Sequence, residues 1–193
     1  MIRHLRNGAV ALLFAHPVAA DVVPVLWSSA VGGNDHYYAY VATDSRVTWA
    51  QARQLARQSE YDLEQGYLAT VTSNEEWRFM LDEVLHTNGW LGGSDQESEG
   101  VWRWMTGPET GQLITLALWN GTEPNNRNNE DYLAAWLRNG ETERGWNDAS
   151  GAHTMPGYIV EFGGLGPVPL PASALLLAAG MGGMGLLGRR RRA

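Results

Sequence analysis

Side chains that carry oxygen atoms gather in three short stretches in the second half of the chain. These are Glu123-Pro124-Asn125-Asn126, Asn128-Asn129-Glu130-Asp131 and Gly145-Trp146-Asn147-Asp148. Calcium takes roughly six to eight oxygen ligands from carboxylates, amide carbonyls and waters, and it tolerates irregular geometry. The mixture is supplied by five residues: Glu123, Asn125, Glu130, Asn147 and Asp148. Because a divalent cation would offset most of the repulsion between the three carboxylates, these stretches predict a calcium site.

The order of these stretches resembles that of the C-type lectin-like domain family. The matching motifs are EPN at residues 123–125, a Glu-Asp pair at 130–131 and WND at 146–148. The resemblance implies that the five residues bind calcium and that the ion then binds two adjacent sugar hydroxyls, with EPN as the variant associated with mannose-type sugars. It also implies hydrogen bonds to the sugar from Glu123, Asn125, Glu130 and Asn147. The alternative is a polar loop that turns on Asn, Gly and Pro.

A second acidic cluster precedes this region. Asp95 and Glu99 stand four residues apart in a loop flanked by Gly and Ser. The resemblance implies an auxiliary calcium held by this pair together with Asp131. The family usually has an acidic residue where this chain has Asn126, so the auxiliary site would lack one carboxylate.

Composition excludes several classes of protein. All 14 basic residues are arginine, and six of them lie near the two ends, which leaves eight against 21 acidic residues in between. That balance argues against nucleic acid as a partner, because phosphate binding needs clustered cations. The chain has no cysteine, so disulfides, thiolate metal sites and a cysteine nucleophile are excluded.

Two helices and several strands are expected to position the predicted ligands. Thr48 is a candidate N-cap for a first helix with Trp49, Ala52, Leu55 and Ala56 on its apolar face. Ser73 and Glu76 form a candidate capping box for a second helix. Its apolar residues fall at helical spacing: Trp77, Met80, Leu81, Val84 and Leu85. Strands are expected over residues 36–41, 66–71, 90–95, 132–137 and 158–162.

The resemblance covers residues 35–162 and implies an α+β C-type lectin-like fold. Two helices would pack on short antiparallel sheets, with a long calcium-binding loop. Trp102 and Trp104 alternate as in a strand, and we expect them in the core rather than stacked on sugar rings. Tyr132 and Val160 stand where the family commonly has disulfide cysteines, so the loop would depend more on calcium. His153 is expected to be a solvated loop residue.

The first residues of the chain predict export. Residues 1–20 are typical of a secretory signal peptide, with Arg3 and Arg6 before a short apolar run and Val18-Ala19-Ala20 as the cleavage site. His4 and His16 lie within this segment and are poor ligand candidates. The mature domain is expected to span residues 21–162, followed by a linker rich in Gly and Pro over 163–167.

Residues 168–193 resemble the PEP-CTERM sorting tail of Gram-negative bacteria. The tail begins VPLPA, with Leu170 in place of the usual glutamate, and ends in four arginines after an apolar run. The resemblance implies recognition and removal by a membrane protease, after a transient stage in the inner membrane through residues 172–187 with the arginines in the cytoplasm. The alternative is a permanent anchor, for which about 24 Å of helix is short.

The expected function is calcium-dependent carbohydrate binding outside the cell, with the exopolysaccharide matrix as a candidate ligand. Two other classes stay open. A module for non-sugar partners would use the same fold with calcium in a structural role only. A glycosidase would use paired carboxylates, but carboxylates committed to a cation are poor proton donors, so we do not expect an enzyme.

Overall fold

A computed structural model describes residues 22–138 and 143–167 of the chain. The expected signal peptide and sorting tail lie outside these residues. The elements in chain order are β1 Val25–Trp27, η1 Ser29–Val31, β2 His36–Val47, α1 Trp49–Gln58, β3 Glu60–Tyr61, β4 Glu64–Leu68, α2 Asn74–Phe79, η2 Met80–Val84, β5 Gly89–Ser94, β6 Arg103–Trp104, β7 Tyr132–Arg138, β8 Glu143–Ala149 and β9 Met155–Pro167. Within the described residues, no helix is long and apolar enough to cross a membrane.

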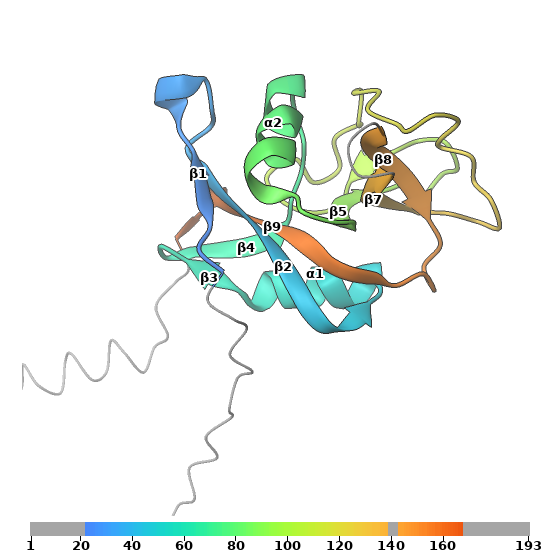
Figure 1. The fold of residues 1–193 in the computed structure, drawn as a ribbon, viewed down its shortest axis with the longest axis horizontal. Helices are drawn as coiled ribbons and strands as arrows, with labels where there is room; N and C mark the ends of the chain where they lie inside the picture. The colour runs from blue at the N-terminus through green and yellow to red at the C-terminus, as the bar shows by residue number, and fades with distance from the viewer. Residues whose placement is uncertain (1–21, 139–142, 168–193) are drawn as a thin grey trace, which may run out of the picture.

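The sheet is built around β9. One edge of β9 pairs antiparallel with β2, and its other edge pairs antiparallel with β4 and in parallel with β5 at Trp90 and Tyr158. Strands β7 and β8 extend the sheet beyond β5, and β1 lies on the outer side of β2. Strand β1 and the C-terminal end of β9 lie on the same side of the molecule, while the long segment between β6 and β7 lies on the opposite side (Figure 1).

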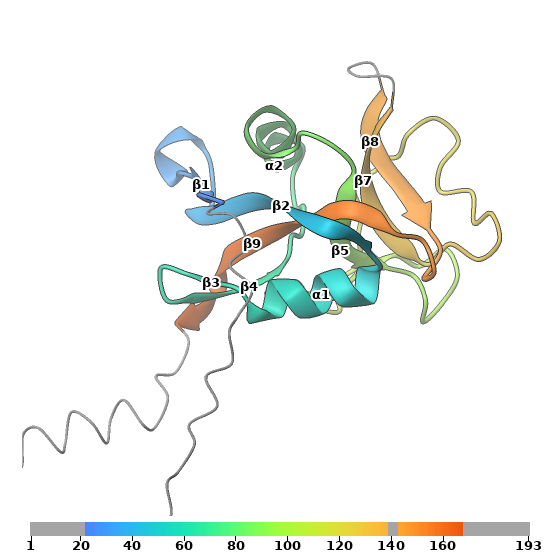
Figure 2. The same ribbon diagram turned by 60° about the horizontal axis from the view of Figure 1, so that its bottom comes forward.

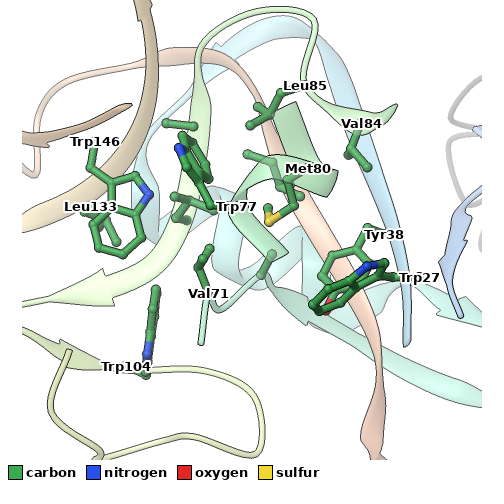
Figure 3. Close-up of a cluster of buried hydrophobic side chains, with 14 of the residues drawn as sticks. Trp27, Tyr38, Val71, Trp77, Met80, Val84, Leu85, Trp104, Leu133 and Trp146 are labelled. Atoms are coloured by element: carbon green, nitrogen blue, oxygen red, sulfur yellow. The ribbon is translucent and has the colours of Figure 1, made fainter. Parts of the chain in front are cut away.

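The two helices cover opposite faces of the β2–β9 pair (Figures 1 and 2). Alternation along β9 explains why both faces can be buried. Ile159 joins a core cluster with Trp77 of α2, whereas Tyr158 and Val160 join a second cluster with Ala52 of α1. The α2 cluster is rich in large rings, as Figure 3 shows. It includes Trp102 and Trp104, so the expectation that these two tryptophans belong to the core is confirmed.

The helices begin where the sequence predicts. Thr48 caps α1 in a full capping box, because its side chain accepts from Gln51 N while the Gln51 side chain accepts from Thr48 N. Ser73 caps α2 by accepting from Glu76 N at 3.0 Å. The other half of the predicted capping box, in which the Glu76 side chain would accept from Ser73 N, is wrong. The Glu76 carboxylate accepts instead from Thr72 N and Thr72 Oγ1, at 2.6 and 2.8 Å.

Glu76 belongs to a buried polar network between α2 and the sheet. Tyr38 Oη lies 2.6 Å from Glu76 Oε1 and 3.1 Å from Glu161 Oε1, and Glu161 also accepts from Thr70 N. Burial, and then the charge of Glu161, raises the pKa of Glu76. His36 lies 2.7 Å from Glu161 at the edge of the network, and this hydrogen bond raises the pKa of the imidazole. Each of these two buried carboxylates thus has protein donors.

Three boundaries differ from the sequence expectation. The strand expected over 66–71 ends at Leu68 in β4, and the second helix passes into a single π-helical turn at Met80. Residues 163–167, which we assigned to a linker, form the end of β9, and Pro167 pairs with Glu64. Backbone pairing with β4 therefore returns at Pro167, after a shift of register between Gly66 and Glu64.

We predict that Tyr38→Phe lowers the free energy of unfolding by about 1–3 kcal/mol, because it leaves two buried carboxylates without this donor. Denaturant unfolding at pH 7 measures the change. Tyr158→Phe is the matched control, since it removes the same atom from a buried ring whose hydroxyl makes no hydrogen bond within the described residues. Equal losses in the two variants would contradict the role of the network.

Candidate functional site

The long segment between β6 and β7 is fixed to β8 before it reaches the predicted ligands. Asn120 N donates to Trp146 O at 2.8 Å, and Trp146 N donates to Leu118 O at 2.7 Å. The rings of Trp119 and Trp146 meet edge to face with centroids 5.8 Å apart. Glu123 N then donates to Asn120 O at 2.8 Å. These contacts place Glu123 beside β8.

The β7–β8 hairpin positions the other two predicted ligands of the C-terminal stretch. Asn147 and Asp148 pair in register with Ala134 and Leu133. Asn147 is half-buried, and its Nδ2 donates to the carbonyl oxygen of Asp148. Asp148 is fully buried, and its Oδ2 accepts from Asn126 N at 2.7 Å. Its Oδ1 is buried without a hydrogen-bond partner in the described part of the chain.

The remaining three predicted ligands are joined to one another within the loop. Asn125 Nδ2 donates to the Glu123 carboxylate, across a Glu123–Pro124 peptide bond that is cis. Arg127 N donates to Asn125 Oδ1 at 2.9 Å and to Glu130 Oε2 at 3.1 Å. The structure therefore brings Glu123, Asn125 and Glu130 together in one loop.

The acidic groups of the site lie close enough to affect each other's pKa values. Burial, and then the neighbouring Asp148 carboxylate, raises the pKa of Glu123. Burial, and then the charge of Asp148, also raises the pKa of Glu130. Two carboxyl groups whose ionised forms are disfavoured by burial and by the charge of Asp148 make a place where a cation would be stabilised.

The donor set fits a hard cation in its chemistry. It combines carboxylate and amide oxygens, and it includes the buried, unpartnered Oδ1 of Asp148. Within residues 22–138 and 143–167, however, no group of three or more His, Asp or Glu side chains is arranged so that it could hold a metal ion. The side chains bond instead to one another and to N–H groups of the loop, as Asn125 does to Glu123.

The second acidic cluster also comes together. Asp95, at the end of β5, is 2% exposed and accepts from Gly100 N at 2.9 Å through Oδ2, while its Oδ1 is buried without a partner among the described residues. Asp95 N donates to Asp131 O at 3.2 Å. The pKa of Asp95 is raised by burial first, and also by the charges of Glu99 and Asp131. The residues predicted for an auxiliary ion therefore share one place.

Asn126 has a role that sequence reasoning missed. Its N–H donates to Asp148 and its Oδ1 accepts from Glu130 N at 2.8 Å, so it joins the two halves of the site. Its φ of 47° lies in the left-handed region, which Asn tolerates better than most residues. Asn128 and Asn129 also have positive φ, so the run of asparagines was the available signal.

The expectation for His153 was wrong. Its ring meets Trp90 edge to face at a centroid distance of 6.2 Å and lies 6.0 Å from Trp136. Burial, and then Arg46, lowers the pKa of His153. The residue therefore packs as a half-buried ring instead of facing water.

Comparison with known proteins gives one consistent result. The family model described as Lectin C-type domain matches residues 45–155. Halomucin of Haloquadratum walsbyi is 39% identical over 143 residues, which cover 67% of this chain and 1% of that protein. C-type lectin domain family 4 member F of Mus musculus is 30% identical over 131 residues, which cover 64% of this chain and 21% of that protein. The chain thus spans a small part of the length of these relatives.

A solved structure, that of the C-type lectin CEL-I from Cucumaria echinata, shares the fold. It aligns with a TM-score of 0.55 and 24% identity, covering 68% of this chain and 93% of that one. The α+β architecture of two helices and a mostly antiparallel sheet is therefore confirmed.

We predict that Asp148→Asn raises the melting temperature in EDTA, because it relieves repulsion with Glu123 and Glu130 while keeping an acceptor for Asn126 N. The raised pKa values of Glu123 and Glu130 mean that these groups keep their protons to higher pH in the folded state than in the unfolded state. The stability of the wild type should therefore rise as the pH falls through the window above 4.5. The stability of Asp148→Asn should depend less on pH in this window. Asp44→Asn, an exposed site on β2, is the charge-matched control; a lower melting temperature for Asp148→Asn would count against the repulsion.

Proposed function

Because the chain belongs to the C-type lectin family, we propose that its domain binds carbohydrate through a calcium ion held by the long loop and β8. The observation that carries the proposal is the buried Asp148 carboxylate, whose Oδ1 has no partner in the described residues and whose charge raises the pKa of Glu130. A bound cation would give Asp148 Oδ1 a partner and would offset the charge that raises the pKa of Glu130.

The proposed roles follow from the donor chemistry of each side chain. Five residues would hold the ion: Glu123, Asn125, Glu130, Asn147 and Asp148. When bound, calcium supplies open positions for two sugar hydroxyls. Glu123 and Glu130 would accept hydrogen bonds from those hydroxyls, while the amides of Asn125 and Asn147 would donate to them. Asp95, Glu99 and Asp131 would hold an auxiliary ion, since Oδ1 of Asp95, like Oδ1 of Asp148, is buried without a partner among the described residues.

We propose a mannose-type sugar as the ligand, on the EPN motif at residues 123–125. Binding through one ion and a few hydrogen bonds should be weak, and a millimolar dissociation constant corresponds to only about −4 kcal/mol. Useful retention would then need several copies of the domain or a repetitive glycan. An exopolysaccharide outside the cell meets that need.

The two terminal segments support an exported location in this proposal. Residues 1–20 would direct export, and residues 168–193 would be recognised by a membrane sorting protease after transient anchoring through 172–187. The mass of the mature protein distinguishes removal of the tail from permanent anchoring. Loss of the tail would support the sorting protease, whereas a protein that keeps residues 168–193 would favour the permanent anchor.

Glycan binding with and without calcium tests the proposed function directly. A mannan polymer should retain the domain in calcium and release it in EDTA. Binding that survives EDTA, or no glycan binding, would favour a module for non-sugar partners on the same fold. Hydrolysis of glycans without calcium would favour the glycosidase alternative.

We predict that calcium raises the melting temperature, because an ion bound only by the folded state stabilises it by about 2.7 kcal/mol at a hundredfold excess over Kd. Asp148→Asn should abolish the increase, whereas Asp44→Asn should keep it. Thermal unfolding with calcium and with EDTA measures both. Equal melting temperatures of the wild type in calcium and in EDTA would contradict the ion site.

We predict that Glu123→Gln combined with Asn125→Asp weakens mannose-type binding while keeping calcium affinity within about tenfold, or 1.4 kcal/mol. The exchange reverses which side of the ion donates and which accepts, and it leaves the charge unchanged. Calorimetric titration with calcium and then with mannose oligomers separates the two effects. Unchanged binding of both ligands would show that these residues do not select the sugar.

A further inference from the structure

The outer face of α1 carries a pocket that the calcium site does not use. Its volume is 430 Å³, within the range of roughly 300–1,000 Å³ typical of small-molecule sites. Its lining is polar: Ala50, Arg53, Gln54, Arg57, Gln58 and Gln65. Figure 2 shows α1 along one face of the sheet, away from the loop that carries Glu123. The pocket is thus a separate place on the molecule.

Both charged residues of the lining are arginines. Arg53 is held in position, because its Nη2 donates to Met105 O at 3.2 Å and its guanidinium lies 5.4 Å from the centre of the Trp49 ring. Its Nε is buried without a hydrogen-bond partner among the described residues. Arg57 is exposed one turn further along the helix. The two guanidinium groups therefore stand on one side of α1, one of them already ordered by the protein.

Neither arginine is neutralised by the protein. Within residues 22–138 and 143–167 the one ion pair joins His36 to Glu161, so no carboxylate lies within 4.0 Å of Arg53 or Arg57. This holds although acidic residues outnumber basic ones, 21 to 14, in the whole chain. Glu60, the register partner of Gln65, also makes no such pair. A pocket lined by cations and amides, in an acidic protein, has the chemistry of an anion site.

Helix stabilisation accounts for part of this arrangement. Arg57 lies in the last turn of α1, where a positive charge is favourable toward the helix dipole. Arg78 has the same place in α2. This effect does not explain Arg53, which lies in the middle of α1, nor the three glutamines around the pocket.

We propose that this pocket binds a carboxylate-bearing sugar, a uronic acid unit of an acidic polysaccharide. Guanidinium groups bind carboxylates through paired, charge-assisted hydrogen bonds. Glutamine amides both donate and accept, which suits the hydroxyls of a sugar ring. The inference deepens the proposed function, because it names the glycan class, but it requires no calcium.

The pocket and the loop would then engage one polymer at two places. When two sites of the domain bind the same polymer, the overall affinity exceeds that of either site alone, because the second binding event is intramolecular. The acidic surface opposes the approach of a polyanion, but this repulsion is screened beyond about 8 Å at physiological salt. Binding should therefore depend on the local arginines more than on net charge.

Titration of trigalacturonate into the folded domain in EDTA tests the proposal. We expect binding to the wild type, about tenfold weaker binding to Arg57→Gln, since one charge-assisted contact is of the order of 1.4 kcal/mol, and loss of binding on adding Arg53→Gln. Arg78→Gln is the matched control, because it removes the same charge from the last turn of the other helix. It should bind as the wild type does.

Three outcomes would overturn the proposal: no trigalacturonate binding in EDTA, equal losses in Arg57→Gln and Arg78→Gln, or equal binding of inorganic sulfate at the same concentration. The calcium site is tested separately by mannan retention in calcium, which the α1 variants should leave unchanged. Asp148→Asn should give the reverse pattern, with mannan lost and trigalacturonate kept.

Discussion

The burial of one carboxylate, that of Asp148, is the constraint on which the loop surface depends. Its neighbours on β8, Trp146 and Ala149, are also buried, so the strand cannot turn this side chain toward water without exposing its own core. Burying a charge is costly unless it is paired or hydrogen-bonded. One of its oxygens is met by the N–H of Asn126, and the loop is folded around that contact. The other oxygen is buried without a partner in the described part of the chain, and it is the atom on which our proposal of a calcium site rests.

Other buried carboxylates show that this fold can satisfy such groups when they serve packing. Glu76 and Glu161 are each 1% exposed, and both are met by hydroxyl and N–H donors from neighbouring elements. Of the three buried carboxylate oxygens without a partner in the described residues, one belongs to Glu64 and the others to Asp95 and Asp148. The contrast separates two buried carboxylates whose oxygens all have donors from three carboxylates that each keep one buried oxygen without a donor.

Sequence reasoning succeeded where one residue type and a short spacing carry the information. Thr48 and Ser73 mark the two helix starts through their side-chain oxygens. The calcium ligands stay a prediction, although β8, which carries two of them, pairs with β7. It failed where a role depends on distant partners. The partners of Glu76 include Tyr38, 38 residues away. The run of asparagines indicates the positive φ of Asn126, but it does not show that Asn126 contacts both Asp148 and Glu130.

The shared position of β1 and the end of β9 sets how the domain can be mounted. Both lie on the side of the molecule opposite the long loop (Figure 1). Any polypeptide joined to either end would therefore leave the molecule on the side away from the loop. In a domain attached in this way, neighbouring segments can vary in length and composition without covering the long loop.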